Sequence, residues 1–449
     1  MASTYDAIII GGGHNGLVTA AYLARSGKKT LVLERRRLVG GAAVTEEIFP
    51  GFRFSVCSYV VSLLRPEIIR ELELARHGLE ILPLDGTFTP MPDGDYLWRV
   101  NDHAETRREL SRHSRRDAEA YEEYSRAMVD MGRFVKPILG MTPFDPTSCD
   151  PRSLMQLLSL GKRFRALPRC SQQLQVQLAT MSAADFLDQW FETDVLKATM
   201  AASGVTGTFL GVRSPGTAYV LLHHYMGEID GAFRSWGLPR GGTGAISNAI
   251  ASAAREAGAE IRTGAPVAKV LLNRGRTSGV LLENGDSVFA NIVASSVDPR
   301  LTFFKMVGKE HLPDDFVEDV SRYKLRGSSG KVNLALDALP NFTSLPGAGP
   351  HLRGGLTISP SVDYMERAYD DAKYGKYSRH PYIDMVIPTL SDPSMAPPGK
   401  HVLSCFVQYA PYHLRSGTWD DQRERFGDSV VDTIAEYAPN LKDIILHRQ

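Results

Sequence analysis

The N-terminal residues form an apolar run, a glycine cluster, a helical pattern and a second apolar run. Tyr5 to Ile10 is mostly apolar and ends directly at glycines, which is typical of a buried parallel strand that runs into a tight turn. Apolar residues then recur at helical spacing from Leu17 to Ala24, and Gly27 suits the C-terminal cap of that helix. Thr30 to Leu33 is apolar again. This pattern predicts a strand–helix–strand unit at the start of the chain.

The glycine cluster fits the G-x-G-x-x-G pattern of a dinucleotide-binding loop. Gly11 permits the turn, Gly13 lets the backbone approach a pyrophosphate, and Gly16 lets the helix pack on the strands. Glu34 ends the second strand, where its carboxylate can accept hydrogen bonds from ribose hydroxyls and would repel the 2′-phosphate of NADP. The alternative is a glycine loop that binds no nucleotide. The residues predicted to contact the nucleotide here are Gly11, Gly13, His14, Asn15, Gly16 and Glu34.

A second glycine pair distinguishes FAD from NAD. Gly40 and Gly41 follow Glu34 closely, and an NAD domain has no need of them. An acid followed by this pair resembles the long fingerprint of the FAD superfamily that includes amine oxidases and carotenoid desaturases, in which the pair lies against the pyrophosphate. Ala42 stands where that fingerprint usually has arginine. The other interpretation of the pair is a surface loop.

The rest of the chain predicts an α/β protein: a discontinuous, Rossmann-like FAD-binding domain with an inserted α+β substrate domain. Residues 66–235 have mainly helical periodicity, and Gly237 to Gly244 reads as a loop near the flavin, followed by an Ala-rich helix. Asn284 and Gly285 between alternating segments predict a hairpin. We assign residues 1–65 and 236–305 to the FAD-binding domain, and 66–235 and 306–449 to the substrate domain. Strands are predicted over Val267–Leu272, Gly279–Glu283, Ser287–Ala290, Ile292–Ser295, Lys331–Asp337, Tyr382–Ile387 and Val402–Tyr409.

Composition is that of an ordinary globular enzyme. The 449 residues carry 51 basic and 51 acidic side chains, which argues against a nucleic-acid partner. The N-terminus lacks the pattern of a signal peptide, and no run approaches the ~20 apolar residues that span a bilayer. The cysteines are far apart, so we expect no metal site and no redox disulfide, but free, buried thiols of a reducing compartment. They are Cys57, Cys149, Cys170 and Cys405.

The same order of motifs resembles the phytoene-desaturase-like FAD oxidoreductases along nearly the whole chain. The strings that carry the resemblance are Glu34–Glu47, Ser58–Pro66, His223-His224 with Met226, Gly241–Ala251 and Gln408–Leu414. The resemblance implies that FAD contacts Gly11, Gly13, Gly16, Glu34, Arg35, Gly40 and Gly41, and that the backbone of Val267 lies beside the adenine. Members of the family continue beyond the position of Gln449 with a segment that closes over the flavin ring, so we expect this chain to be a fragment.

Candidates for the substrate side lead into the Gly241 loop. They are His223, His224, Arg234 and Trp236, although adjacent histidines on a helix point in two directions, so at most one should reach a cavity. No catalytic residue is assigned, because flavin N5 accepts hydride itself. Leucines alternate with basic residues over Arg152–Arg169, which indicates an amphipathic segment. Such a segment packs against the second domain or another subunit, or contacts a membrane surface.

We therefore expect an FAD-dependent dehydrogenase or desaturase that acts on a hydrophobic small molecule. A narrower version is a carotenoid desaturase or isomerase. The alternative from another class is a flavin-fold regulatory or interaction protein, near respiratory complexes, with little turnover. A bacterial chain of this kind would lie in the cytoplasm and a eukaryotic counterpart in the mitochondrial matrix, with homo-oligomers as a further expectation.

Overall fold

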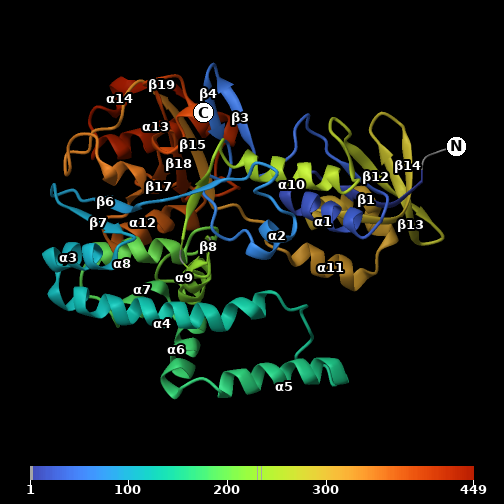
Figure 1. The fold of residues 1–449 in the computed structure, drawn as a ribbon, viewed down its shortest axis with the longest axis horizontal. Coiled ribbons are helices and arrows are strands. Elements are labelled where there is room, and N and C mark those ends of the chain that lie inside the picture. Colours follow the sequence, from blue (N-terminus) through green and yellow to red (C-terminus); the bar gives the residue numbers. More distant parts are fainter. Residues whose placement is uncertain (1–3, 230, 234) are drawn as a thin grey trace.

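The computed structural model describes residues 4–229, 231–233 and 235–449. Figure 1 shows two sheets side by side, with a layer of helices below the second one. The sheet near the N-terminus has six strands in the order β11-β2-β1-β14-β13-β12, and its central strands run parallel. These strands are β1 (Thr4–Ile10), β2 (Thr30–Leu33), β11 (Glu260–Arg262), β12 (Val267–Asn273), β13 (Arg276–Leu282) and β14 (Ser287–Ser295).

Sequence pattern accounts for this first sheet closely. Helix α1 (His14–Arg25) packs on helix α10 (Gly244–Glu256) through alanines, and both cover one face of the sheet. Gly27 follows α1 with φ +80°, as predicted for its cap. The hairpin turn at Gly285 is also confirmed. The two short strands predicted over residues 287–295 are wrong in one respect, because they form the single strand β14, which is continuous through Asn291.

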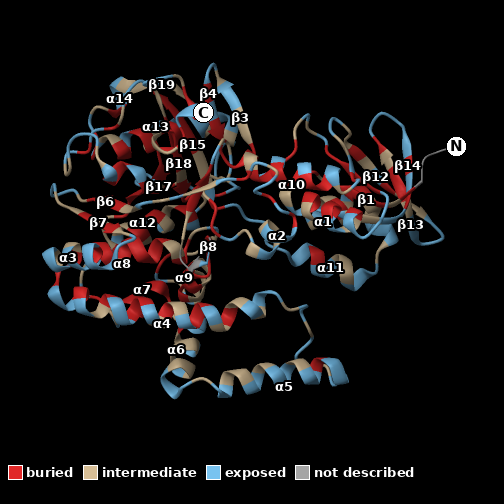
Figure 2. Ribbon diagram, in the orientation of Figure 1, coloured by how far each residue is buried: buried red, intermediate tan, exposed pale blue. Residues whose placement is uncertain are grey.

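The second sheet has seven strands in the order β19-β15-β18-β17-β16-β6-β7. Its outer face is covered by α13 (Trp419–Ala435) and α14 (Leu441–Ile444) over a cluster of buried apolar side chains, and Figure 2 shows the interior between them as buried. Its inner face is turned toward the helical layer. The strands are β6 (Gly86–Pro90), β7 (Tyr96–Val100), β15 (Ser329–Leu336), β16 (Gly355–Ile358), β17 (Tyr382–Val386), β18 (His401–Gln408) and β19 (Ile445–Arg448).

The region expected to be mainly helical also supplies strands to this sheet. Strands β6 and β7 come from it, because Tyr96 to Val100 alternates buried and half-buried positions as a strand does. The helices of the region, together with one later helix, form the lower layer. They are α3 (His103–His113), α4 (Arg115–Leu139), α5 (Pro151–Arg165), α6 (Arg169–Thr180), α7 (Ala183–Asp188), α8 (Asp194–Ala201), α9 (Thr217–Tyr225) and α12 (Val362–Lys373).

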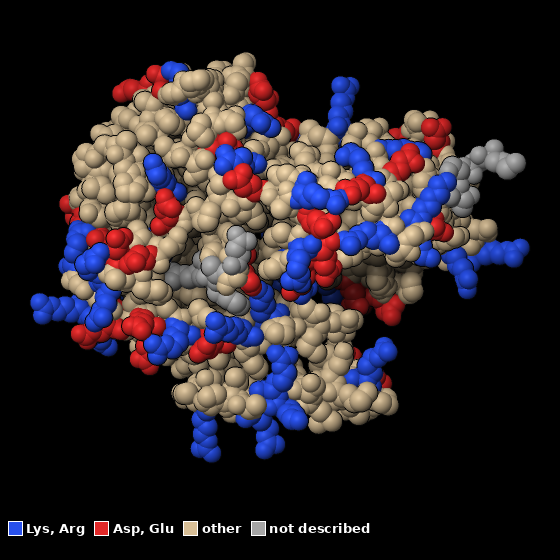
Figure 3. Space-filling view, viewed as in Figure 1, with Lys and Arg blue, Asp and Glu red and all other residues tan. Residues whose placement is uncertain are grey.

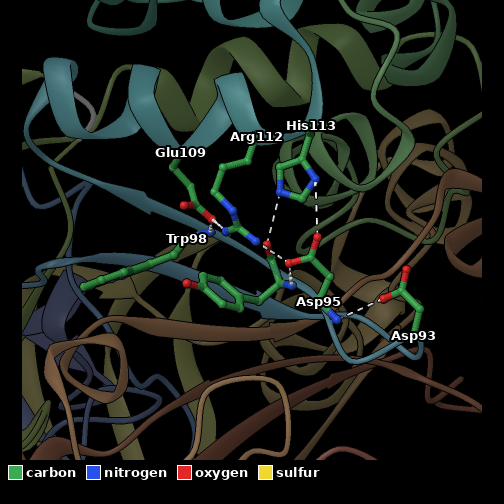
Figure 4. Close-up of polar contacts among 7 residues, drawn as sticks. Asp93, Asp95, Trp98, Glu109, Arg112 and His113 are labelled. Carbon is green, nitrogen blue, oxygen red and sulfur yellow. Dashed lines mark hydrogen bonds and ion pairs between the residues drawn. The ribbon is translucent and has the colours of Figure 1, made fainter.

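The β6–β7 hairpin is fastened to α3 by a cluster of polar side chains (Figure 4). Arg112 on α3 makes ion pairs with Glu109 and with Asp95 at the hairpin turn, and it lies over the ring of Tyr96. His113 contacts the Tyr96 carbonyl at 3.1 Å. Burial raises the pKa of Asp95, but the hydrogen bond from the Tyr96 amide and the charge of Arg112 together lower it by more, so the pKa lies below its usual value. The hairpin is therefore held in place at the end away from its cavity-lining residues.

Shorter elements connect the two sheets. The hairpin of β3 (Thr45–Phe49) and β4 (Phe52–Ser55) follows the second glycine pair. The loop predicted near the flavin begins with a short strand, β10 (Gly237–Pro239), which pairs with β5 (Ile81–Pro83). The division into domains at residues 66, 236 and 306 stays a prediction. The remaining helices and strands are α2 (Pro66–Glu71), β8 (Glu228–Ile229), β9 (Ala232–Phe233) and α11 (Asp314–Arg322).

Candidate active site

The first glycine loop is folded as a dinucleotide loop requires. Gly11 has φ +96°, a conformation that favours glycine. A methyl group added at Gly16 would lie 2.2 Å from the Gly11 carbonyl oxygen, so α1 can pack on the loop only because residue 16 has no side chain. Gly40 donates its N–H to the Gly12 carbonyl at 2.8 Å, which places the second glycine pair directly on the first loop. The structure thus brings both predicted loops together.

The surface between these loops has room and donors for a pyrophosphate. A methyl group on Gly13 would meet nothing nearer than the Gly41 Cα at 3.9 Å. Gly13 precedes α1 without a capping side chain, so the first N–H groups of the helix are open to an anion. His14 Nδ1 is buried and has no hydrogen-bond partner among the described residues. Burial lowers the pKa of this imidazole, and Asn15 beside it is exposed. These residues fit a bound dinucleotide.

Glu34 has two tasks at the end of β2. Its carboxylate accepts the Gly12 N–H at 2.7 Å and the Arg36 N–H at 2.8 Å, so it fixes the glycine loop through the backbone. A carboxylate has lone pairs beyond these two bonds, so ribose hydroxyls can still be accepted. Arg35, the next residue, is exposed. Glu34 therefore lies at the end of β2, as predicted from the sequence, and the structure shows that its carboxylate also holds the glycine loop.

The remaining predicted cofactor residues flank the same edge. The segment before β12 docks on the end of β2, where Ala265 donates its N–H to the Glu34 carbonyl at 2.9 Å. Val267 begins β12 with a buried side chain, so only its backbone can face a ligand, as the resemblance implies. Ala42 is exposed and accepts hydrogen bonds from Ser58 through its carbonyl.

The Gly241 loop connects this nucleotide edge to the second sheet. Thr243 donates its N–H to the Ser55 hydroxyl at 3.1 Å, and Gly244 donates to Thr45 at 2.9 Å. Ser247 on α10 donates to the Ala43 carbonyl, beside the second glycine pair. The loop therefore lies between the glycine loops and the cavity described next.

A cavity of about 620 Å³ lies between the inner face of the seven-stranded sheet and the helical layer. His224 and Trp236 line it with their rings stacked at 5.8 Å, whereas His223 is not among its lining residues. This agrees with the expectation that at most one of the two adjacent histidines reaches a cavity. Arg234 lies outside the described residues. The lining of the cavity also includes Tyr59, Val60, Thr87, Arg99, Gly355, Thr357, Asp384 and Val386.

One cross-strand row beside the cavity carries half-buried ionisable groups. Lys331, Phe406 and Asp384 are register partners on β15, β18 and β17. Tyr59 stacks on Phe406 at 5.6 Å and donates a hydrogen bond to Asp384. The Lys331 ammonium lies 5.1 Å from the centre of the Tyr59 ring and bonds to the Ser404 hydroxyl and the Ser55 carbonyl. The row joins an acid, a phenol and an amine away from bulk water.

Burial shifts these groups toward neutrality. Desolvation raises the pKa of Asp384 to about 6, although the Tyr59 hydroxyl and Lys331 act in the opposite direction. Desolvation also lowers the pKa of Lys331 to about 8 and raises that of Tyr59 well above its usual value. A group whose pKa lies near the working pH can both take and give a proton. The row is therefore able to handle protons at the wall of the cavity.

The sequence analysis did not single out Tyr59, Lys331, Asp384 or Arg99. A signal was present, because Asp384 and Arg99 each interrupt a strand that is otherwise apolar or aromatic, Tyr-Ile-Asp-Met-Val and Tyr-Leu-Trp-Arg-Val. A charge inside such a strand is costly unless it is used. What the sequence could not give is that β7 and β17 belong to one sheet.

The cysteine prediction is partly wrong. Only Cys405 is buried, in the core under the second sheet, while Cys57, Cys149 and Cys170 are exposed. These three stand next to loops or at a helix start, where no core forms around them. Within the described ranges, no group of His, Cys, Asp and Glu side chains could hold a metal ion, and no helix is long and apolar enough to cross a membrane.

Comparisons with known proteins agree with this geometry. The family of flavin containing amine oxidoreductases matches residues 16–441. Pyridine nucleotide-disulfide oxidoreductase domain-containing protein 2 of Rattus norvegicus is 41% identical, over 99% of this chain and 80% of the rat protein. A component of the limonene dehydrogenase of Castellaniella defragrans is 26% identical, over 96% of this chain and 78% of that protein. An oxidoreductase from Methanosarcina mazei has a similar solved structure, with a TM-score of 0.60 at 17% identity, covering 100% of this chain and 87% of that one.

Proposed function

Because the chain belongs to the family of flavin containing amine oxidoreductases, we propose that it takes hydride from a largely apolar small molecule bound in the cavity beside Tyr59. The chain is an FAD-dependent oxidoreductase with the α/β fold of that family. Both glycine loops, the first turn of α1 and Glu34 would hold the FAD. When bound, FAD supplies an acceptor for hydride.

The observation that carries the proposal is the position of Ser55. Its hydroxyl accepts the N–H of Thr243 in the loop next to the glycine loops, and its carbonyl accepts a hydrogen bond from Lys331, which lies over the ring of the cavity-lining Tyr59. One residue thus touches both the nucleotide side and the proton-handling row. A substrate at Tyr59 would lie at the end of the cavity that is nearest the cofactor loops.

The chain's own residues then have to manage a proton. When a C–H bond of the substrate breaks and its hydrogen leaves as hydride, a neighbouring C–H, N–H or O–H of the substrate loses a proton. Tyr59 Oη accepts that proton while its own phenolic proton passes to Asp384 Oδ2, along the hydrogen bond that already joins them. Lys331 stabilises the charge of the pair from across the ring. The apolar part of the lining, Val60, Trp236 and Val386, excludes water.

The test is an anaerobic screen. The purified chain is loaded with FAD, and apolar small molecules, monoterpenes and polyenes among them, are added while the flavin absorbance is followed. We expect bleaching with at least one molecule, and a slower rate but unchanged flavin content in Tyr59→Phe. Tyr374→Phe, which changes an exposed tyrosine, is the matched control. A protein that never acquires flavin bands contradicts the proposal, and bleaching equally fast in Tyr59→Phe contradicts the role of Tyr59.

The carotenoid version and the interaction-protein alternative are separated by the same screen. Bleaching by polyenes alone would favour a carotenoid desaturase or isomerase. A stable flavoprotein whose flavin no added molecule reduces would favour a regulatory or interaction protein.

A further inference from the structure

Arg99 is a buried cation in the wall of the cavity. It lies on β7 with 8% of its surface exposed and faces the same side of the sheet as the fully buried Leu97, two residues earlier. Its cross-strand neighbour on β6 is Thr87, which also lines the cavity. The guanidinium is therefore turned toward the cavity.

No protein group neutralises this charge in the described part of the chain. Arg99 Nε is buried without a hydrogen-bond partner, and no carboxylate of the described residues lies within 4.0 Å of the guanidinium. Asp384, the acid of the cavity lining, is three strands away in the sheet, roughly 14 Å at the usual strand spacing, and accepts its bond from Tyr59. A buried, unpaired guanidinium is strongly unfavourable, so a protein keeps one where an anion binds.

We propose that Arg99 binds the carboxylate of the substrate and so directs the rest of the molecule toward Tyr59. This inference rests on the proposed function, in which the cavity holds the substrate. A guanidinium matches a carboxylate with two parallel hydrogen bonds, and the Thr87 hydroxyl adds a further polar contact. Gly355, the register partner of Thr87 on β16, offers space, and Val386 on β17 adds an apolar part of the lining. The substrate class is thus an apolar chain or ring system with a carboxylate at one end.

Binding of simple acids and alcohols tests the inference without turnover. Octanoate, decanoate and dodecanoate are compared with the matching alcohols on the FAD-loaded full chain, by calorimetry and by perturbation of the flavin spectrum. We expect the acids to bind more tightly than the alcohols. In Arg99→Met the acids should bind about 10- to 100-fold more weakly, since charge-assisted hydrogen bonds are lost, while the alcohols change little. Arg99→Lys should restore part of the affinity for acids.

Arg326→Met, which removes an exposed arginine far from the cavity in sequence, is the matched control. Flavin content and thermal unfolding show whether each variant is folded. Wild-type protein that prefers the alcohols, or an Arg99→Met variant that binds acids as tightly as wild type, overturns the inference. If flavin fails to bind, the proposed function fails. If acids bind through Arg99 but no flavin is ever reduced, only the redox part fails.

One face of α5 is exposed, and no described part of the chain covers it. Leu154, Met155, Leu157 and Leu158 are all exposed, Leu158 by 72%. Phe164, near the C-terminal end of α5, contacts α4, with its ring 6.4 Å from that of Phe134. The alternative predicted from sequence, packing of this face on the second domain, is therefore not observed.

The charge around these residues has one sign. Residues 151–184 contain Arg152, Lys162, Arg163, Arg165 and Arg169 and no Asp or Glu; the nearest acid, Asp150, caps the helix. Lys162 and Arg165 are exposed, one and two turns beyond the leucines. Figure 3 shows basic side chains projecting from the lower edge of the molecule, where α5 and α6 lie.

We infer that the α5 face binds the surface of an anionic lipid bilayer. The leucine and methionine side chains would insert at the boundary of the acyl chains, while Lys162 and Arg165 contact lipid phosphates. An anionic bilayer offers both an apolar layer and negative charge, whereas a neutral protein surface lacks the charge. A bilayer can supply the apolar substrates of the proposed function, but the proposal of membrane binding does not depend on that function.

Vesicle flotation tests this inference. The full chain should float with phosphatidylcholine vesicles that contain phosphatidylglycerol, less with phosphatidylcholine alone, and less again at high salt. Leu154→Ser with Leu158→Ser, and Lys162→Glu with Arg165→Glu, should each reduce the bound fraction about tenfold or more, since several contacts are lost at once. Leu325→Ser and Lys305→Glu with Arg326→Glu are matched changes of exposed residues elsewhere. The inference is overturned if the α5 variants float as well as wild type. It is also overturned if wild type is a dimer and the α5 variants are monomers.

Discussion

Tyr59 donates a hydrogen bond to the half-buried carboxylate of Asp384, across 325 positions of sequence. Tyr59 follows the second glycine pair, whereas Asp384 lies on β17 of the other sheet. The bond therefore joins the segment that leaves the cofactor loops to the floor of the cavity. Both side chains are half-buried and joined directly, so a change in either alters the proton affinity of the other.

Removing the Tyr59 hydroxyl should raise the pKa of Asp384. Desolvation raises this pKa to about 6 even though the hydrogen bond from Tyr59 lowers it, so Tyr59→Phe removes an interaction that favours the charged carboxylate. One neutral-to-charged hydrogen bond corresponds to about one pKa unit or more. Infrared spectra should show the band of the protonated carboxyl persisting to higher pH than in wild type, with Asp384→Asn identifying the band. If the titration midpoint of this band is the same in Tyr59→Phe and in wild type, the hydrogen bond does not affect the pKa of Asp384.

The Asp384 carboxyl should also make stability depend on pH. Its folded pKa, about 6, is above the ordinary value of 3.8, so its stabilising contribution is full below pH 3.8 and is lost as pH rises through 6. Relative to Asp384→Asn, the free energy of unfolding of wild type should fall by about 2 kcal/mol between about pH 4 and pH 7. Urea denaturation at the two pH values measures this. Asp286→Asn, in the exposed β13–β14 turn, should give no such difference.

The cofactor loops were predictable from sequence because their information is local. Gly11, Gly16 and Glu34 lie within one strand–helix–strand unit, so spacing along the chain already fixes how they meet. The helix cap at Gly27 and the turn at Gly285 follow from the conformations that glycine alone adopts easily.

The cavity was not predictable because its residues meet through long-range pairing. Asp384 lies on β17 and Arg99 on β7, and the two strands belong to one sheet only because β6 and β7 join it beyond β16. The order of strands in a mixed sheet is not written in their individual patterns, since each strand reads as apolar and extended wherever it pairs. A charge within an apolar strand marks a candidate, but the fold decides which charges share a cavity.

Gly16 and Gly13 should respond differently to alanine. In Gly16→Ala the new methyl would overlap the Gly11 carbonyl at 2.2 Å, so the free energy of unfolding should fall by about 2 kcal/mol or more. Gly13 has φ −69°, which alanine adopts, and free space, so Gly13→Ala should be as stable as wild type within about 0.5 kcal/mol. Its methyl would instead stand where a phosphate approaches, so FAD should bind at least tenfold more weakly. Thermal unfolding without FAD and titration with FAD separate the two effects. Equal stability of both variants would contradict this account.

Glu34→Gln tests whether the acid shapes the loop before any ribose binds. The carboxylate accepts N–H bonds through both oxygens, but an amide has one oxygen and would turn its NH₂ group toward one of these donors. Leaving that buried N–H without an acceptor should lower the free energy of unfolding by about 1–3 kcal/mol even without FAD. Glu283→Gln, an exposed acid beside the β13–β14 turn, is the control and should change stability little. If Glu34→Gln weakened FAD binding and left the stability of the FAD-free chain unchanged, the acid would act on the ribose alone. Loss of both would mean that the same carboxylate builds the loop and then reads the cofactor.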